Sequence, residues 1–132
     1  MRASARANAT VLGMNPVIGL SFGRIAVGAA AVANPHVAAR MFQLDPVSNP
    51  QVSYMTRLFG SREIALGLVT LAVRGKGRRG VIGLGVAVDL VDAATGYLAM
   101  RDGTVSRKTA LTLIGPAVGA TASGVAGLLR RG

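Results

Sequence analysis

Five ionisable side chains lie inside stretches of sequence that are otherwise apolar enough to cross a bilayer. They are Arg24, Arg62, Glu63, Asp89 and Asp92. A charged side chain at the centre of a membrane costs about 2.5–3.5 kcal/mol on the insertion scale. Such residues usually face one another or a water-filled cavity, and they often carry protons, ions or ligands. We therefore take these five as the candidate site residues of an intramembrane charged cluster.

The same residues give little support for metal binding or catalysis. Asp89 and Asp92 are three apart, so they project from one face of a helix, but no His or Cys accompanies them. The chain has no cysteine, and its one histidine, His36, lies in a predicted connection. No pair of nucleophile and base and no cofactor motif is visible. The sequence predicts no catalytic residue, metal or cofactor, and an enzyme is the function class that it favours least.

The composition places these residues in a membrane protein. Of 132 residues, 51% are hydrophobic and 15% are charged, and the mean hydropathy is +0.48. Such a chain is too apolar for a soluble domain with so few aromatic residues. The formal net charge of +10 does not indicate nucleic-acid binding, because Lys and Arg lie between apolar runs and no nucleic-acid motif occurs. The length predicts a single membrane domain covering residues 1–132.

Four apolar segments supply the elements that must position the charges: residues 16–34, 54–73, 81–100 and 109–129. At about 1.5 Å per residue, each segment can cover about 30 Å of hydrocarbon. We predict an all-α integral membrane protein built as a four-helix bundle. The second segment carries Arg57, Arg62 and Glu63, so a half-buried or re-entrant segment is the alternative at that place.

Lys and Arg in the connections predict the orientation of the bundle. Eight lie on the side of the two termini and of the connection at 74–80, whereas five lie on the opposite side. We predict a multi-pass protein of the cell membrane with both termini cytoplasmic. The run RGKGRR at 74–79 could additionally hold anionic lipid headgroups. The basic, acid-poor start resembles a signal or transit peptide, but Arg24 interrupts the apolar run that a signal peptide needs.

All five charged residues are predicted at one depth. Counted from the inner end of each segment, they lie about 12–17 Å into the membrane, at about 1.5 Å per residue. Arg24 and Arg62 are therefore the expected counter-ions of the three carboxylates. Two positive charges face three negative ones, and the excess requires a protonated carboxyl, a cation, a substrate amine or water. Ion pairs that only hold the helices together are the alternative interpretation.

Small residues predict where helices pack closely. Four of them recur every fourth residue along the last segment: Gly115, Gly119, Ser123 and Gly127. Such a stripe lets another helix approach, either within the bundle or from a second copy of the chain. The connection at 34–55 contains three prolines. The spacing of its apolar residues allows a short helix after Pro35 that lies along the membrane interface, or a lid over the outer mouth of the bundle. A plain ordered connection is the favoured interpretation.

These residues resemble the pattern of a known family. The chain resembles small four-helix membrane proteins of bacteria at three places. These are Pro35 with Arg40 and Phe42, the run RLFGSREIALGL at 57–68, and the Asp-x-x-Asp formed by Asp89 and Asp92. That family is frequent in actinobacteria, has no known function and is distantly similar to DoxX-like proteins. The resemblance covers residues 12–129 and implies fold and membrane location while leaving the function open. A Gly is expected after the Phe, where this chain has Gln43.

Two classes of function remain. In the first, the protein is an accessory or assembly partner of a membrane complex, in contact with membrane lipid and with another membrane protein or a second copy of itself. In the second, the charged cluster binds or conducts protons, a small cation or a lipid-soluble ligand. A chain of 132 residues leaves little room for a gated transport path. We therefore rank the first class ahead.

Overall fold

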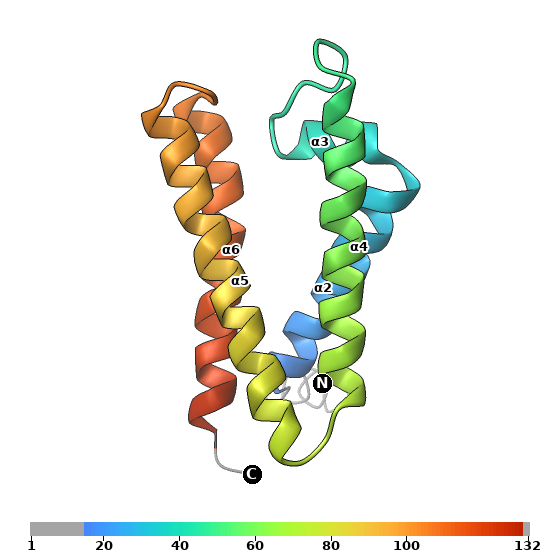
Figure 1. The fold of residues 1–132 in the computed structure, drawn as a ribbon, viewed down its shortest axis with the longest axis vertical. Coiled ribbons are helices and arrows are strands. Elements are labelled where there is room, and N and C mark those ends of the chain that lie inside the picture. Colours follow the sequence, from blue (N-terminus) through green and yellow to red (C-terminus); the bar gives the residue numbers. More distant parts are fainter. Residues whose placement is uncertain (1–14, 131–132) are drawn as a thin grey trace, which may run out of the picture.

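The computed structural model describes residues 15–130, and these residues are helical, with no strand among them. Figure 1 shows them as two pairs of long helices with a short helix near one end. The prediction of an all-α protein is confirmed for this part of the chain. The elements in chain order are α2 (Pro16–Ala33), α3 (Pro35–Met41), α4 (Gln51–Ala72), α5 (Lys76–Arg101) and α6 (Arg107–Leu129).

Three of the described helices are long and apolar enough to cross a membrane, namely α2, α5 and α6. They contain nearly all of the first, third and fourth predicted segments, which supports the interpretation as a membrane protein. Helix α4 matches the second segment and has 22 residues, but Arg57, Arg62 and Glu63 interrupt its apolar sequence. In lipid, this helix would depend on its neighbours to neutralise those charges.

Side-chain caps and prolines explain where three of the helices begin. Asn15 accepts a hydrogen bond from a backbone N–H of the first turn of α2, and Pro16 is the first helical residue. Asn34 and Pro35 repeat this arrangement at the start of α3. Ser106 caps the start of α6 in the same way. These side chains satisfy donors that a first turn leaves free, and Pro has no such donor to lose.

Two connections differ from the expectation. The connection predicted at 74–80 is shorter, because α5 already begins at Lys76, after a turn at Gly75 with a φ of 69°. Lys and Arg are good helix formers, so the basic run continues the helix instead of ending it. After α2, the short helix Pro35–Met41 forms where a plain connection was favoured. Arg40 is exposed on this helix, at the outward position expected for it.

Helix α3 ends in a turn that usually takes glycine. The backbone N–H of Leu44 donates to the carbonyl of Ala39, and the N–H of Gln43 donates to the carbonyl of Arg40. This pair of bonds is a Schellman motif, in which the residue after the helix end is left-handed and most often glycine. Here that residue is Gln43, with a φ of 61°. The position where the family resemblance implies Gly therefore has a conformation that favours Gly.

The long helices pack as two pairs, α2 with α4 and α5 with α6. Glycines let the backbones of the first pair approach, since a Cβ on Gly60 would lie 2.7 Å from the carbonyl oxygen of Gly28. In the second pair, a Cβ on Gly96 would lie 2.9 Å from Cγ1 of Ile114. Close contact through small residues is how helices associate in lipid, where no hydrophobic force drives them together.

The two pairs meet through α2 with α6 and through α4 with α5, and they pack on each other less extensively than the helices within each pair. In Figure 1 the pairs are closest toward the end that holds the connection between α4 and α5. They separate toward the end that holds α3. The arrangement of the two pairs therefore depends on a small area of contact between them. The five predicted charged residues lie at this junction.

Candidate functional site

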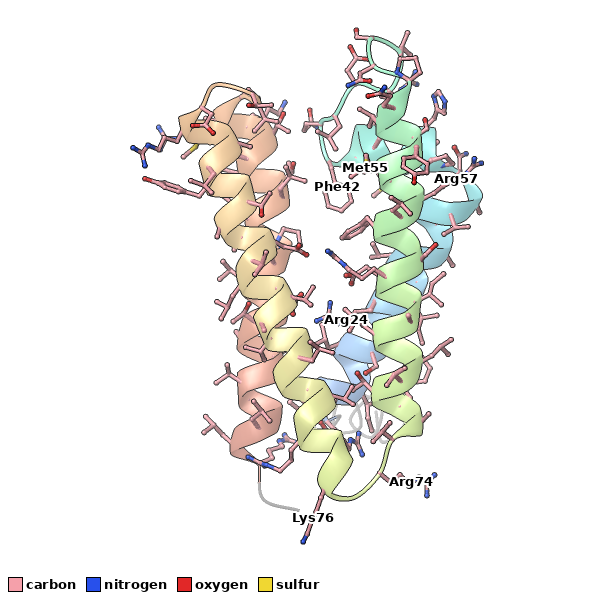
Figure 2. The ribbon with its side chains drawn as sticks, in the orientation of Figure 1. Arg24, Phe42, Met55, Arg57, Arg74 and Lys76 are labelled. Atoms are coloured by element: carbon pink, nitrogen blue, oxygen red, sulfur yellow. The ribbon has the colours of Figure 1, made fainter. Side chains whose placement is uncertain are left out.

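Three of the five predicted residues, Arg24, Glu63 and Asp89, lie on inward helix faces. On α2 the buried residues recur every three or four positions, as expected for one face of a helix. They are Val17, Ser21, Arg24, Gly28 and Ala31. Glu63 on α4 and Asp89 on α5 likewise belong to the buried faces of their helices. Figure 2 shows Arg24 pointing from α2 toward the other helix pair. Three helices thus bring their charges to the same junction.

Arg24 binds two carboxylates with one guanidinium group. Its Nη2 donates to Asp89 Oδ2 at 2.5 Å and its Nη1 to Asp89 Oδ1 at 3.0 Å, a bidentate geometry that orients both planar groups. The same Nη1 donates to Glu63 Oε2 at 2.9 Å. The side chains of Arg24, Glu63 and Asp89 are only 7%, 7% and 4% exposed. This half of the cluster is sealed by the surrounding helices.

Arg62 forms the second half of the cluster. Its Nη2 donates to Asp92 Oδ2 at 2.6 Å and its Nη1 to Asp92 Oδ1 at 3.2 Å. The same Nη2 lies 3.3 Å from Glu63 Oε1. Glu63 therefore offers one oxygen to each guanidinium and joins the two halves. The result is a chain of alternating charges in the order Asp89, Arg24, Glu63, Arg62 and Asp92, which we call the ion-pair network.

The ion-pair network is closed at one end and open at the other. Arg62 and Asp92 keep 38% and 29% of their side-chain surface exposed. The guanidinium of Arg62 lies over the ring of Phe59, with 5.1 Å from Cζ to the ring centroid, which is within the range of a cation–π contact. Its buried Nε has no hydrogen-bond partner among the described residues. The open end thus has an unused donor as well as access from outside the fold.

The chemistry available to the ion-pair network follows from its charge. Three carboxylates and two guanidiniums sum to −1, and an excess carboxylate in a low-dielectric setting can take up a proton or attract a cation. A cavity of about 10 Å³ touches Ser21, Arg24 and Gly85 at the sealed end, which is about the space that one water needs. Within residues 15–130, no three His, Cys, Asp or Glu side chains are grouped to hold a metal ion.

The four residues of the predicted helix-packing stripe on α6 do not all pack against the same neighbouring helix. Only the end of the stripe at Gly127 packs inside the fold. A Cβ on Gly115 or Gly119 would meet nothing within 4 Å, whereas Gly127 approaches Val17 of α2 closely. Ser123 donates to the Gly119 carbonyl oxygen of its own helix at 3.0 Å. The buried residues of α6 are instead Thr109, Ala110, Ala117 and Gly124. The open part of the stripe faces outward, and its role in packing stays a prediction.

Three residues that join the site to the end of α3 were not singled out from the sequence, namely Phe59, Thr109 and Thr112. Phe59 packs edge to face on Phe42, with ring centroids 6.0 Å apart. Thr109 and Thr112 donate to the carbonyl oxygens of Gln43 and Phe42 at 3.0 and 2.8 Å. Phe59 lies one turn before the charged residues of α4, so helix periodicity could have indicated it. The threonines gave no signal, because their partners lie 66 and 70 residues away in the sequence.

One described family matches most of the chain. Residues 21–130 match the family described as Domain of unknown function (DUF4267). The chain belongs to this family. The matched range includes every residue of the ion-pair network and all of α3, α4, α5 and α6. The expectation of a family without assigned function is thereby confirmed, whereas the likeness to DoxX-like proteins and an actinobacterial source stay predictions.

No curated protein and no solved structure matches the DUF4267 chain. Membership in the family supplies no activity, since its description states none. The function therefore has to be inferred from the ion-pair network, the pockets and the exposed faces of this chain.

Proposed function

We propose that the DUF4267 protein is a four-helix bundle of the cell membrane, with α4 as its fourth span and both termini cytoplasmic. The ion-pair network neutralises Arg62 and Glu63, two of the three charges that interrupt α4. The start of α2, the connection between α4 and α5 and the end of α6 lie at one end in Figure 1. Five of the eight Lys and Arg that the sequence count assigns to the cytoplasmic side lie at that end, namely Arg74, Lys76, Arg78, Arg79 and Arg130. The excess over the other side comes from Arg2, Arg6 and Arg131, which lie outside the described residues, so the orientation rests on the sequence count.

Within this bundle, the protein serves as an accessory or assembly partner of a membrane complex. The observation that carries this proposal is the internal pairing of all five charged groups across α2, α4 and α5. Because every charged group in the network has a partner of opposite sign, the network holds the helices in one arrangement. A fixed arrangement suits a protein that presents a surface to a partner, whereas a transport path needs groups that exchange partners.

The surface assigned to the partner is the open part of the α6 stripe. Gly115 and Gly119 adjoin open space, and the large apolar side chains of Leu111 and Val118 are exposed beside them. Small residues flanked by larger ones allow close approach of a helix in lipid. The proposed partner is therefore a transmembrane helix, from another membrane protein or from a second copy of this chain.

Co-purification in a gentle detergent tests this assignment. The Gly119→Leu variant should lose the partner, because the new side chain keeps the approaching helix away. Gly23→Leu on α2 is the matched control, since a Cβ there also meets nothing within 4 Å, and it should retain the partner. The mass of the detergent-solubilised particle distinguishes a second copy from another protein. Equal recovery with both variants would contradict the proposed surface.

Proton or small-cation binding is a second candidate function, favoured by the excess carboxylate and the partly exposed pair of Arg62 and Asp92. The substitution Asp92→Asn keeps the size and hydrogen bonding of the side chain and removes its ability to titrate. A folded variant that fails to complement a deletion strain would support this function. If Asp89→Asn and Asp92→Asn, singly and combined, are folded and complement fully, the carboxylates have a structural role only.

A further inference from the structure

Positive charge is concentrated at the end of the fold that holds the connection between α4 and α5. The run RGKGRRG at 74–80 consists only of Lys, Arg and Gly. Its four basic side chains are exposed or partly exposed, and none of them has an ion-pair partner among the described residues. Figure 2 shows Arg74 and Lys76 pointing away from the bundle. These charges are therefore free to meet a partner outside the fold.

Arg130 adds a fifth charge at the same level. Helices α5 and α6 are antiparallel neighbours, and a Cβ on Gly124 would lie 2.6 Å from Cγ2 of Val86. Counting six residues on from Gly124 and six back from Val86 places Arg130 beside Gly80 in the helix pair. Arg130 is exposed. We call this group the basic surface, and it consists of Arg74, Lys76, Arg78, Arg79 and Arg130.

The carboxylates of the chain are kept away from the basic surface. All five acidic side chains belong to residues 15–130, and three of them form part of the ion-pair network. The other two, Asp45 and Asp102, lie in the connections at the opposite end of the fold. Acidic residues contribute little to the positive-inside rule, so a topology signal alone does not require this separation. Binding of an anion does require it, because a nearby carboxylate would repel the ligand.

The place of the basic surface along the helices identifies the anion as a lipid headgroup. Helix α4 ends at Ala72, and the apolar part of α5 begins at Val81. The surface thus lies directly beyond two apolar segments, at the level of the headgroups of a bilayer. Clusters of about four to eight Lys and Arg at this level bind anionic lipids. A Cβ on Gly75 or Gly80 would meet nothing within 4 Å, so a headgroup can approach the backbone closely.

We propose that the basic surface docks the phosphate group of an anionic phospholipid from the cytoplasmic leaflet. The phosphate lies over Gly80, among the basic side chains, and the acyl chains remain in the bilayer beside α5. This inference rests on the membrane location and orientation proposed above, and it is independent of the helix partner assigned to α6. Loss of the lipid preference would leave the co-purification result with Gly119→Leu unaffected, so the two proposals fail separately.

Native mass spectrometry of the full chain in detergent tests the docking, because it counts bound lipids and does not depend on orientation in a membrane. We expect phosphatidylglycerol to bind more tightly than phosphatidylcholine. Each basic residue contributes about 5-fold to attraction by an anionic surface. The combined variant Lys76→Gln, Arg78→Gln and Arg79→Gln should therefore lower the preference by at least that factor. Equal binding of the two lipids to the unaltered chain would overturn the proposal.

The opposite end of the fold supplies the matched control. Arg101→Gln, Arg107→Gln and Lys108→Gln, combined, remove the same amount of charge from the connection between α5 and α6. This variant should retain the preference for phosphatidylglycerol, and circular dichroism establishes that both variants are folded. An equal loss in the two variants would assign the preference to net charge and refute a site at the basic surface.

Close approach of the phosphate is tested without any change in charge. Gly80→Leu places a bulky side chain among the basic residues and should weaken the preference for phosphatidylglycerol. Gly83→Leu, three residues further into the apolar part of α5, should retain it. A Cβ at either position would meet nothing within 4 Å, so both variants are expected to fold. An unchanged preference in folded Gly80→Leu would show that the phosphate does not lie over Gly80.

Discussion

Arg24 is the residue on which the sealed half of the ion-pair network depends. Among residues 15–130, its guanidinium is the one ion-pair partner of Asp89, and it shares Glu63 with Arg62. Both carboxylates are almost fully buried, so neither can turn to water if Arg24 is lost. Removal of one partner from a buried pair costs about 3–5 kcal/mol, because the remaining charge stays in a low-dielectric setting.

We expect Arg24→Ala to lower the free energy of unfolding by about 3–5 kcal/mol. A second change, Asp89→Asn, should recover part of the loss because the neutral amide no longer needs a counter-ion. Denaturant unfolding in detergent, followed by circular dichroism, measures both. Arg74→Ala, in the exposed connection before α5, is the control and should change little. Strictly additive losses for Arg24 and Asp89 would show that the two residues are not coupled.

Asp45 illustrates a charged residue outside the candidate spans. Its carboxylate accepts hydrogen bonds from the hydroxyl and the backbone N–H of Ser48 and from the backbone N–H of Val47. The hydroxyl of Ser48 is the main cause that holds the pKa of Asp45 below its ordinary value of 3.8. Since the folded-state pKa is lowered, this turn stabilises the fold above the ordinary pKa, and that contribution is lost as pH falls through the lowered value.

The substitution Ser48→Ala should raise the pKa of Asp45 toward its ordinary value, because the largest stabiliser of the carboxylate is removed. The pH-dependent contribution of the turn to stability should shrink in the same variant. Titration of the Asp45 carboxyl carbon by NMR measures the shift. Ser61→Ala, whose hydroxyl bonds within α4, is the control. An unchanged pKa in Ser48→Ala would assign the effect to the backbone donors.

At the scale of the element, the end of α3 has a residue poorly matched to its conformation. Gln43 occupies the left-handed position of a Schellman motif with a φ of 61°. A residue with a Cβ is destabilised by about 1–2 kcal/mol in the left-handed region, and Gly avoids this cost. Gly also loses more conformational entropy on folding, which offsets part of the gain in stability.

We therefore expect Gln43→Gly to raise the free energy of unfolding by up to about 1 kcal/mol. The same substitution at Gln51, the exposed first residue of α4, should lower it or leave it unchanged. Thermal unfolding in detergent compares the two variants. A loss of stability in Gln43→Gly as large as that in Gln51→Gly would mean that the side chain of Gln43 makes a contribution outside this backbone argument.

The contact between α2 and α4 depends on glycine. A Cβ on Gly60 would lie 2.7 Å from the carbonyl oxygen of Gly28, a backbone atom that a side-chain rotation cannot move. We expect Gly60→Ala to force the helices apart and to cost about 1–3 kcal/mol, as overpacking usually does. Gly23→Ala, where a Cβ meets nothing, should be neutral or stabilising. Denaturant unfolding measures both, and equal effects would contradict the close crossing.

At the scale of the whole molecule, the proposed orientation in the membrane rests on the distribution of Lys and Arg in the sequence. Lys76 begins α5 and Thr104 lies in the connection between α5 and α6, at the two ends of one helix. The chain has no cysteine, so Lys76→Cys and Thr104→Cys each give one thiol. An impermeant maleimide should label only Thr104→Cys in intact cells, and Lys76→Cys after permeabilisation. Labelling of both from the same side would reject the proposed topology.

The sequence alone determined the long helical segments and the matching positions of the charges along them. Hydropathy and the rise of about 1.5 Å per residue are local properties, so they survive any packing of the helices. The last segment, predicted at 109–129, is α6 at Arg107–Leu129. The predicted connection at 74–80 was wrong in part, because α5 begins at Lys76. The helix propensity of Lys and Arg extends this helix beyond its apolar part.

Only the tertiary structure decided which charges pair and which faces turn inward. Arg24 bridges Glu63 and Asp89 only if α2 has one particular rotation about its axis relative to α4 and α5. The close contact of Gly28 with Gly60 helps to fix that orientation. On α6, hydropathy could not choose between the stripe at Gly119 and the face that is buried, because both are small and apolar. Rotation of a helix about its axis changes no local property of its sequence, and only contacts with neighbouring helices select one orientation.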